Sequence, residues 1–510
     1  MGGLRNVYFA FSFIALGGLL FGYVIGITGN VVTSGQLLCD ADWAGAVGTW
    51  TSVGYHQCYK LGALEKGFLS SLNLIGACLS SLFCFRYADN MGRKLEVQLA
   101  AVLYAFGAGL AAASPVLWGV YVGLTVYGCG IGFGMHAAPV YIAEISPAVI
   151  RGTMVSAKEA VVVLGIFLGF FVGFVFSGDS MVGWRMMVLV SAIFALVMSV
   201  GMRFVPESPR FLVLKALRSS GLLGGGGAIM DQARDALKFF RNADSLDEVV
   251  AELQQIRNDI AASIGVEEAK WTDAFASRRP LIIGCGLVFL QQVTGQPSVL
   301  YFATNIFKSA GFGSTAALSS LGVGIVKLLA TLFTVWRVDL FGRRFLLFVG
   351  IGMMAAALAL IGTAFVFREC QTPGVTVAAC KANEIGLPTT WALATVGGLM
   401  VYVSGYQVGF GPIAWLMISE IFPLKVRGAA FSIAAVVNFG SNIVMTLTQQ
   451  VLQDALTPSG VFFGYLGLSL ASIVFVCFLV PETKGKTLEE IETMLEGRKD
   501  RARNRATMGA

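Results

Sequence analysis

The sequence predicts an all-α membrane protein whose twelve transmembrane helices form two pseudo-symmetric six-helix bundles. Of its 510 residues, 56% are hydrophobic and only 13% are charged, whereas soluble domains carry about 25% charged residues. Apolar stretches recur that match the ~20 residues needed to span a hydrocarbon core. A set of charged motifs also occurs twice in the same order. These observations disfavour soluble enzymes, nucleic-acid-binding proteins and secreted modules held by disulfides.

Each expected span supplies the ~20 predominantly apolar residues that a membrane of about 30 Å requires. The expected spans are 7–30, 64–86, 95–113, 116–143, 153–177, 184–205, 281–304, 315–337, 345–367, 389–417, 428–452 and 459–480. They predict an N-terminal six-helix bundle (1–205), a linker (206–280), a C-terminal six-helix bundle (281–480) and a tail (481–510). In the linker, apolar and charged residues alternate at a spacing that suits short amphipathic helices lying at the membrane surface.

Basic residues predict the orientation, because Lys and Arg are enriched on the cytosolic side of membrane proteins. One side collects Arg86, Arg93, Lys94, Arg151, Arg210, Lys215, Arg337, Arg343, Arg344, Lys425, Arg427 and the Arg-rich end at 498–505. The other side has only Lys60, Lys66, Arg185, Lys308, Arg368 and Lys381. We therefore expect both termini, the linker and the tail in the cytosol. Only Arg5 precedes the first span, so no cleavable signal is predicted.

The cysteines give a weaker signal. Cys39 and Cys58 lie in one expected outer loop, and Cys370 and Cys380 lie in another. Such pairs suit disulfides in an oxidising compartment, although chance placement is an alternative. No spacing of cysteines and the two histidines matches a metal site, so we expect no metal and no cofactor. Without a nucleophile–base constellation the chain is not expected to be an enzyme, and its net charge of +6 does not indicate a nucleic-acid partner.

An internal repeat is the strongest signal in the sequence. The matched residues are Asp89 and Asp339, Gly92 and Gly342, Arg93 and Arg343, Glu144 and Glu420, Arg151 and Arg427, and Glu207 and Glu482, with offsets of 250, 276 and 275 residues. Arg210 closes the first copy of the third motif. Two halves of parallel topology are typical of transporters that work by alternating access. We expect these charges to pair between the bundles at the cytosolic face and to part when that face opens; the alternative is that they only anchor the topology.

The motifs resemble, almost end to end, those of the sugar porter family of the major facilitator superfamily. They are Gly17–Tyr23, Pro139–Glu144, Pro206–Arg210, Gln291-Gln292, Gly411–Trp415 and Pro481–Gly485. Met135–Pro139 and Gln291–Tyr301 resemble the plant branch called xylose–proton symporter-like, some of whose members act in plastids. The resemblance implies the major facilitator fold and a monomer that carries a hexose or pentose across a lipid bilayer. The outer cysteines favour the cell surface and the branch favours a plastid, so the membrane stays open.

A sugar site needs amide side chains for hydrogen bonds and aromatic rings for stacking. The candidates are Phe21, Glu159, Gln291, Gln292, Tyr301, Tyr406, Gly411, Trp415, Asn438 and Asn442. In the family, the positions that match Gln291, Gln292, Trp415 and Asn438 contact sugar. Gly411-Pro412 is expected to break its helix, and Pro297 replaces a usual sugar-binding Asn, which leaves the choice of sugar open. The alternative role for the amides is to hold helices together.

The coupling mode depends on ionisable residues inside the spans, which usually mark a pathway. Proton-coupled members of the family commonly carry an acid and an arginine where this chain has Val24 and Leu124. Glu159 and His136 lie at similar expected depth and offer another route for protons. Lys158 and Lys327 are possible partners that would keep Glu159 ionised, although Lys158, its neighbour, is expected to point about 100° away.

Two lysines against one acid favour facilitated diffusion of the sugar. Sugar–proton symport through Glu159 and His136 is the alternative. A sugar sensor that does not transport is a remote second alternative, because the residues after Pro481 are too few for a sizeable signalling domain.

Overall fold

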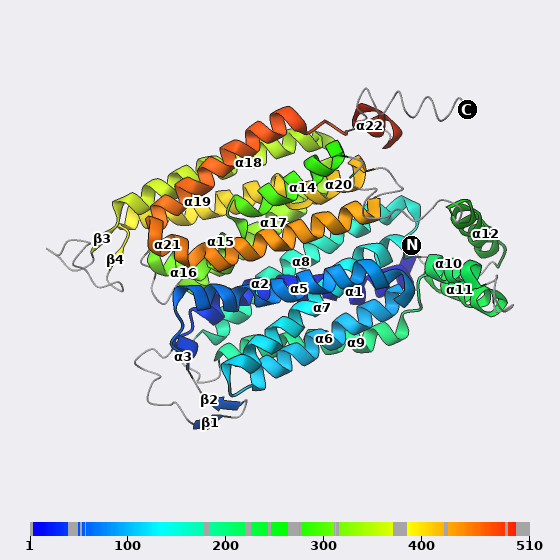
Figure 1. Ribbon diagram of the computed structural model, residues 1–510, viewed down its shortest axis with the longest axis horizontal. Helices are drawn as coiled ribbons and strands as arrows, with labels where there is room; N and C mark the ends of the chain where they lie inside the picture. The colour runs from blue at the N-terminus through cyan, green and yellow to red at the C-terminus, as the bar shows by residue number, and fades with distance from the viewer. Residues whose placement is uncertain are drawn as a thin grey trace. The chain divides into compact units, whose positions relative to one another are not determined.

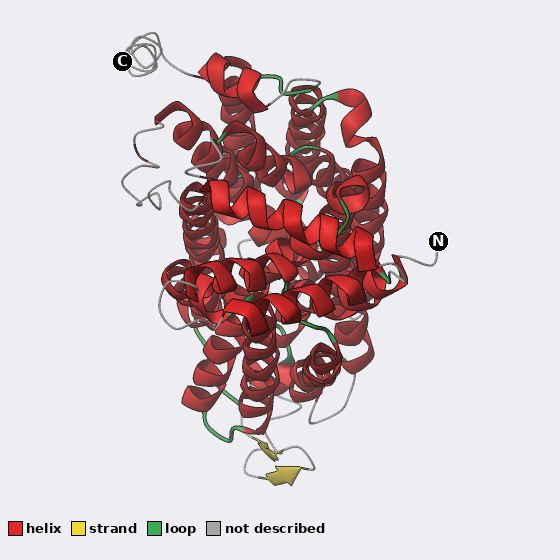
Figure 2. Cartoon of the chain, turned by 90° about the vertical axis from the view of Figure 1, so that its right-hand side faces the viewer, coloured by secondary structure: helices red, strands yellow, loops and turns green. Residues whose placement is uncertain are grey.

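The described part of the computed structural model is helical almost throughout (Figures 1 and 2), and its strands form two short ribbons (Figure 1). It describes residues 4–38, 49–51, 54–56, 58–177, 183–219, 226–242, 246–263, 275, 278–310, 312, 316–370, 385–422, 427–484 and 488–495. The ribbons are antiparallel and pair β1 (Thr49–Thr51) with β2 (Gly54–His56), and β3 (Glu369–Cys370) with β4 (Ile385–Gly386). The chain forms two compact units: unit 1 is Met1–Lys60 with Leu72–Glu267, and unit 2 is Leu61–Ser71 with Glu268–Ala510.

Unit 1 contains a bundle of long apolar helices followed by three shorter ones. The helices are α1 (Arg5–Ile14), α2 (Leu16–Val32), α3 (Gly35–Leu38), α5 (Ala63–Met91, in unit 1 from Leu72), α6 (Arg93–Ala113), α7 (Leu117–Ile145), α8 (Ala148–Phe176), α9 (Gly183–Phe204), α10 (Pro209–Ser219), α11 (Gly226–Arg241) and α12 (Leu246–Ser263). Glycines let α2 and α8 pack backbone to backbone, since a Cβ at Gly22 would lie 1.8 Å from the carbonyl oxygen of Val162. Buried tyrosines add hydrogen bonds between helices, such as that from the Tyr104 hydroxyl to the Gly17 carbonyl at 3.0 Å.

The apolar faces of α10, α11 and α12 pack against one another. Their shared core includes Val213 of α10, Leu237 of α11 and Val249 and Leu253 of α12. The sequence correctly predicts short amphipathic helices here. Their apolar faces are buried in a core of their own, and their position at a membrane surface stays a prediction. The Arg241 guanidinium ties this core to the end of α7, donating to the carbonyl of Ile145 at 2.8 Å.

Unit 2 contains more broken helices than unit 1. Its helices are α14 (Arg278–Val293), α15 (Gln296–Tyr301), α16 (Ala303–Ser309), α17 (Ala316–Phe341), α18 (Arg343–Ala364), the 3₁₀ turn η3 (Phe365–Phe367), α19 (Thr389–Val408), α20 (Phe410–Ile421), α21 (Arg427–Leu479) and α22 (Leu488–Leu495). The expected span 281–304 falls into α14, α15 and α16, with the first break at Gly295, whose φ is +103°. The last two expected spans fall within α21, which is kinked at Thr457 before Pro458.

Ten helical segments of the described residues are long and apolar enough to cross a membrane. The expected span 281–304 is not one of these ten segments. The last two expected spans together form a single one of them, Ala430–Leu479. The number twelve therefore stays a prediction.

The break in the expected span 389–417 lies at Gly409, not at Gly411-Pro412 as the sequence predicts. Helix α19 ends at Val408 and α20 begins at Phe410. Pro412 then occupies the first turn of α20, where a backbone N–H has no intrahelical acceptor and proline is tolerated. The prediction identified a real break and placed it two residues too late.

The cysteines partly follow the prediction. Cys58 and Cys370 are each disulfide-bonded. Their predicted partners, Cys39 and Cys380, lie outside the described residues. Cys78, Cys84, Cys129, Cys285 and Cys477 are free thiols.

Candidate functional site

Buried amides form a small hydrogen-bonded cluster in unit 2. The side-chain nitrogen of Gln291, on α14, donates to the carbonyl oxygens of Phe410 at 3.0 Å and Gly411 at 3.3 Å, on α20. The amide of Asn438, on α21, donates to the side-chain oxygen of Gln291 at 3.3 Å. Three predicted sugar contacts, Gln291, Gly411 and Asn438, therefore meet at one place although they lie on three helices. Because α20 begins just after Gly409, its first carbonyl groups lie within hydrogen-bonding distance of Gln291.

Two polar atoms that the same prediction selected are buried without a hydrogen-bond partner among the described residues. They are the side-chain oxygen of Gln292, on α14, and the hydroxyl of Tyr301, at the end of α15. Leaving a buried polar group unpaired costs about 1–3 kcal/mol, so most such groups pair with protein, water or a ligand. These two atoms are the ones in this region that a bound hydroxyl could satisfy.

The predicted aromatic residues lie in different surroundings. Trp415 is half-buried on α20, with its ring 5.1 Å from that of Phe431. Tyr406 is buried on α19, and the ammonium of Lys327 lies 4.9 Å from its ring centre. A cation over the ring favours Tyr406 as an electrostatic partner of Lys327, whereas Trp415 keeps the character of a stacking platform.

Lys327 is part of a polar network in unit 2. It donates to the side-chain oxygen of Gln407 at 2.7 Å, and the Gln407 amide donates to Thr331 at 2.6 Å. The sequence offered Lys327 as a partner for Glu159. Within unit 2, its neighbours include Gln407 and Tyr406.

Asn442 and Phe21 complete the set of predicted sugar contacts. Asn442 lies one turn after Asn438 and is buried, and its side-chain oxygen accepts a hydrogen bond from Thr446 at 3.1 Å. This local bond fits the alternative that Asn442 supports its helix. Phe21 is half-buried on α2.

Glu159 forms an ion pair with its neighbour Lys158, one of the two lysines that the sequence offered as partners. The Lys158 ammonium lies 3.0 Å from the carboxylate, and both residues are on α8. Their Cα–Cβ bonds diverge by about 100°, but both side chains are long enough to bend toward each other. Lys158 is nearly buried, whereas about a third of the Glu159 side chain is exposed.

His136, on α7, contacts a carboxylate that the sequence analysis did not select. Its Nδ1 lies 2.7 Å from the carboxylate of Glu96, on α6, and that side chain is fully buried. Glu96 lies in the first turn of α6, just after the Gly92–Lys94 motif. Only the fold shows that it points into the bundle.

The duplicated charged motifs build the same network in each unit. In unit 1, Gly92 has φ +90° and turns the chain from α5 into α6. The Arg93 guanidinium lies 3.4 Å from the carboxylate of Glu144. The carboxylate of Glu207 accepts a hydrogen bond from the backbone N–H of Lys94 at 3.0 Å. In unit 2, Gly342 has φ +87°, Arg343 lies 3.0 Å from Glu420, and Glu482 accepts the N–H groups of Arg343 and Arg344 at 3.1 Å.

The two carboxylates Glu207 and Glu482 act as caps for the N-termini of α6 and α18. A carboxylate at this position satisfies free N–H groups and interacts favourably with the helix dipole. Burial raises the pKa of Glu207, and the N–H groups of Ser208 and Lys94 oppose that rise by stabilising the ionised form. The ion pairs Arg93–Glu144 and Arg343–Glu420 each lie inside one unit, whereas the sequence analysis expected pairs between the bundles.

The other predicted gating residues are less clearly engaged. Arg151, at the start of α8, and Arg210, at the start of α10, are half-buried, and the Nε of Arg151 has no hydrogen-bond partner among the described residues. The side chains of Asp89, Asp339 and Arg427 lie outside the described part of the chain.

Comparison with known proteins identifies the family. The family described as "Sugar (and other) transporter" matches residues 10–495. The chain belongs to this sugar transporter family. It is 38% identical to "D-xylose-proton symporter-like 2" of Arabidopsis thaliana, over 94% of this chain and 89% of that protein. It is 39% identical to "D-xylose-proton symporter-like 3, chloroplastic" of the same plant, over 96% of this chain and 82% of that protein.

Solved structures confirm the fold of this sugar transporter family member. The inward-open xylose transporter XylE from E. coli superposes with a TM-score of 0.73 at 25% identity, covering 96% of this chain and all of XylE. XylE bound to 6-bromo-6-deoxy-D-glucose, described as a proton:xylose symporter of the major facilitator superfamily, gives 0.71 at 26% identity, covering 97% of this chain and all of that one. The chain is therefore an all-α membrane protein with the major facilitator fold, as the sequence predicts.

Proposed function

We propose that this protein is a secondary transporter that moves a monosaccharide, a hexose or a pentose, across a membrane by alternating access. The observation that supports it best is the buried amide cluster of unit 2. A dry site that offers several amide groups and an indole ring suits a ligand with many hydroxyls and apolar ring faces. Two relatives that are 38% and 39% identical to this chain are named for xylose.

Gln291, Gln292, Tyr301, Trp415 and Asn438 are the proposed sugar contacts in unit 2. The unpaired oxygen of Gln292 and the unpaired hydroxyl of Tyr301 support this assignment, because a sugar hydroxyl can donate to one and accept from the other. Gln291 is held by two carbonyls and by Asn438, so its amide is already oriented when a sugar arrives. Phe21, Glu159, Tyr406, Gly411 and Asn442 stay predicted contacts.

Uptake of radiolabelled sugars into liposomes that contain the purified protein tests the proposal. We expect saturable uptake of at least one of D-xylose and D-glucose, with the same sugar unlabelled as competitor and empty liposomes as control. Absence of saturable uptake for every hexose and pentose tried, from protein that is correctly folded, would rule out the proposal.

Facilitated diffusion is the proposed mode. The Lys158–Glu159 ion pair favours it, because an ammonium 3.0 Å from the carboxylate gives Glu159 a counter-charge within its own helix. Sugar–proton symport is the second candidate, with Glu159 as the coupling group, and the xylose–proton names of the relatives favour it.

The proposed placement has both termini and the helices α10, α11 and α12 on the cytosolic side of the membrane. The distribution of Lys and Arg supports this orientation. We propose that the protein works as a monomer. One relative is named chloroplastic, which supports a plastid, whereas the disulfide-bonded Cys58 and Cys370 support an oxidising compartment. Imaging a full-length tagged copy distinguishes the two.

A further inference from the structure

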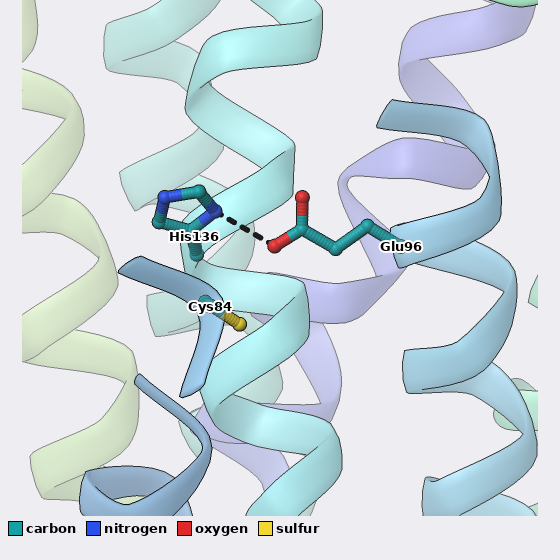
Figure 3. A group of neighbouring side chains, drawn as sticks. All are labelled: Cys84, Glu96 and His136. Atoms are coloured by element: carbon teal, nitrogen blue, oxygen red, sulfur yellow. Dashed lines mark hydrogen bonds and ion pairs between the residues drawn. The ribbon is translucent and has the colours of Figure 1, made fainter. Parts of the chain in front are cut away.

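Three side chains with metal-binding atoms meet inside unit 1, and no step of sugar transport uses them together. They are Cys84 of α5, Glu96 of α6 and His136 of α7, and one ligand atom from each lies within 4.8 Å of the other two. Figure 3 shows the imidazole of His136 and the carboxylate of Glu96 facing each other, with the sulfur of Cys84 beside them. The residues are far apart in sequence, which is why no spacing motif reveals them.

The negative charge of the Glu96 carboxylate is poorly neutralised by its buried surroundings. Its side chain is fully buried, and one of its oxygens has no hydrogen-bond partner among the described residues. Its ion pair is with His136, a group that is charged only when protonated. A buried carboxylate without a full counter-charge and with one oxygen unpaired is costly, so the site favours a bound positive charge.

We propose that Cys84, Glu96 and His136 bind a divalent cation of the Zn²⁺ type. Thiolate, carboxylate and imidazole are all Zn²⁺ ligands, and three protein ligands with one open position form a common class of exchangeable site. On binding, the Cys84 thiol loses its proton to solvent, and His136 coordinates through its neutral imidazole. The two negative charges of thiolate and carboxylate then balance the two positive charges of the metal, which leaves the buried site neutral.

The geometry is close to what coordination requires. Around a tetrahedral Zn²⁺ with bonds of about 2.0–2.3 Å, ligand atoms lie roughly 3.3–3.8 Å apart. The Nδ1–carboxylate distance is 2.7 Å and the ligand atoms all lie within 4.8 Å, so small rotations of the side chains suffice. Cys84 and Glu96 are buried, but 28% of the His136 side chain is exposed, which gives the ion a route in.

The thiolate makes the site selective. Mg²⁺ and Ca²⁺ are hard cations that prefer oxygen ligands and more of them than this site offers. Soft and borderline metals accept sulfur and imidazole nitrogen. The chemical class of the ligand is therefore a borderline divalent metal, and Co²⁺ is a suitable spectroscopic probe for it.

The test is a titration of the purified full-length protein, without a histidine tag and stripped with a chelator, with Co²⁺. We expect one equivalent to bind with a thiolate-to-cobalt charge-transfer absorption, Zn²⁺ to abolish that absorption, and Mg²⁺ and Ca²⁺ to leave it unchanged. Cys84→Ser should remove the charge-transfer band, and Glu96→Gln and His136→Ala should each weaken binding roughly tenfold or more.

Matched controls are available in the same chain. Cys78→Ser removes a free thiol from the same helix, and His56→Ala removes the other histidine; both should bind Co²⁺ as the wild type does. Should the ligand variants fail to fold, the wild-type titration still tests for a thiolate-bound metal, and Cys78→Ser, Cys129→Ser, Cys285→Ser and Cys477→Ser, which should each keep the band, exclude the other free thiols as its source. Wild-type protein without this band, a band that persists in Cys84→Ser, or a band displaced equally by Mg²⁺ would overturn the proposal. Sugar uptake measured on the same protein preparation distinguishes a failure of the metal proposal from a failure of the transport proposal.

Discussion

At the scale of single residues, Gln291 carries the clearest structural information about the site. Its side chain is buried, and both its nitrogen and its oxygen are engaged by neighbours on two other helices. A fixed amide in a dry environment binds a hydroxyl at little cost in entropy, because its orientation is already set.

We expect Gln291→Ala to weaken sugar affinity by about 1–3 kcal/mol, the value of a buried hydrogen bond whose partner is left unpaired. Gln449→Ala, which removes a buried amide bonded to Tyr465 in the same unit, is the matched control. The measurement is the concentration dependence of sugar uptake. An unchanged transport constant in Gln291→Ala would show that the site lies elsewhere.

Trp415→Ala tests the stacking surface. The half-buried indole offers an apolar face to a sugar ring, and its loss should weaken affinity by roughly 0.5–1.5 kcal/mol. Trp336, on α17, is 70% exposed, and Trp336→Ala should leave affinity unchanged. Equal effects of the two substitutions on competition by unlabelled sugar would contradict a specific role for Trp415.

What the sequence could predict about residues was chemical type, and what it could not predict was pairing. Gln291 and Asn438 were identified because a sugar site needs amides, and they do meet. Lys158 and Lys327 were both possible partners of Glu159, and the sequence could not choose between them, because the 100° between neighbouring Cα–Cβ bonds does not account for the reach of the two side chains. Glu96 was missed because a carboxylate near a helix end is usually solvated.

At the scale of helices, the distinctive feature is a carboxylate that caps a helix from a distant segment. Glu482 accepts N–H groups at the start of α18, although 138 residues separate it from Arg344. Helix N-termini have free N–H groups and a partial positive charge, so an ionised acid there both stabilises α18 and fixes the chain after α21.

Glu482→Gln should therefore lower the thermal stability of the protein, by about 0.3–2 kcal/mol, since the amide keeps the shape and loses the charge. Thermal unfolding in detergent measures this, with Glu369→Gln, an exposed acid on β3, as control. A midpoint equal to the wild type would mean that the charge of the cap is not stabilising.

Helix existence was predictable and helix continuity was not. Runs of apolar residues reveal the helices because the membrane imposes their length. The breaks at Gly295 and Gly409 depend on tertiary packing. A Cβ at Gly295 would lie 2.6 Å from the ring of Tyr465, and one at Gly409 would lie 3.1 Å from the backbone of Gly350. A single sequence shows glycines at many positions, and only the fold shows which of them end a helix.

At the scale of the whole molecule, the duplicated motifs predicted the duplicated architecture. Three motifs repeated in the same order, at offsets of 250, 276 and 275 residues, indicated two related halves, and the structure forms two compact units with the same network in each. The partners within that network were not predictable, because Arg93 and Glu144 are separated by two helices and any of several charges at helix ends could have paired.

The coupling mode is a property of the whole transport cycle, and facilitated diffusion predicts a clear result. In proteoliposomes with an inward proton gradient, sugar should equilibrate and not accumulate. The Glu159→Gln variant should also transport sugar, and its uptake should depend on the proton gradient to the same extent as that of the wild type. Accumulation that a protonophore abolishes, and that Glu159→Gln loses, would establish symport with Glu159 as the coupling group.

The conformations of Gly92 and Gly342 have a consequence for how mutations act on this gene. Both residues combine φ near +90° with ψ near +150°, a region that is essentially restricted to glycine. A Cβ at Gly92 would also lie 2.6 Å from the carboxylate of Glu207, and one at Gly342 would lie 3.0 Å from that of Glu482. Every amino-acid change that a single nucleotide can make in a glycine codon adds a side chain. Every missense change at either codon therefore introduces both backbone strain and a close contact with the capping acid. The duplication thus left the gene with two separate codons at which substitutions are poorly tolerated for the same reason.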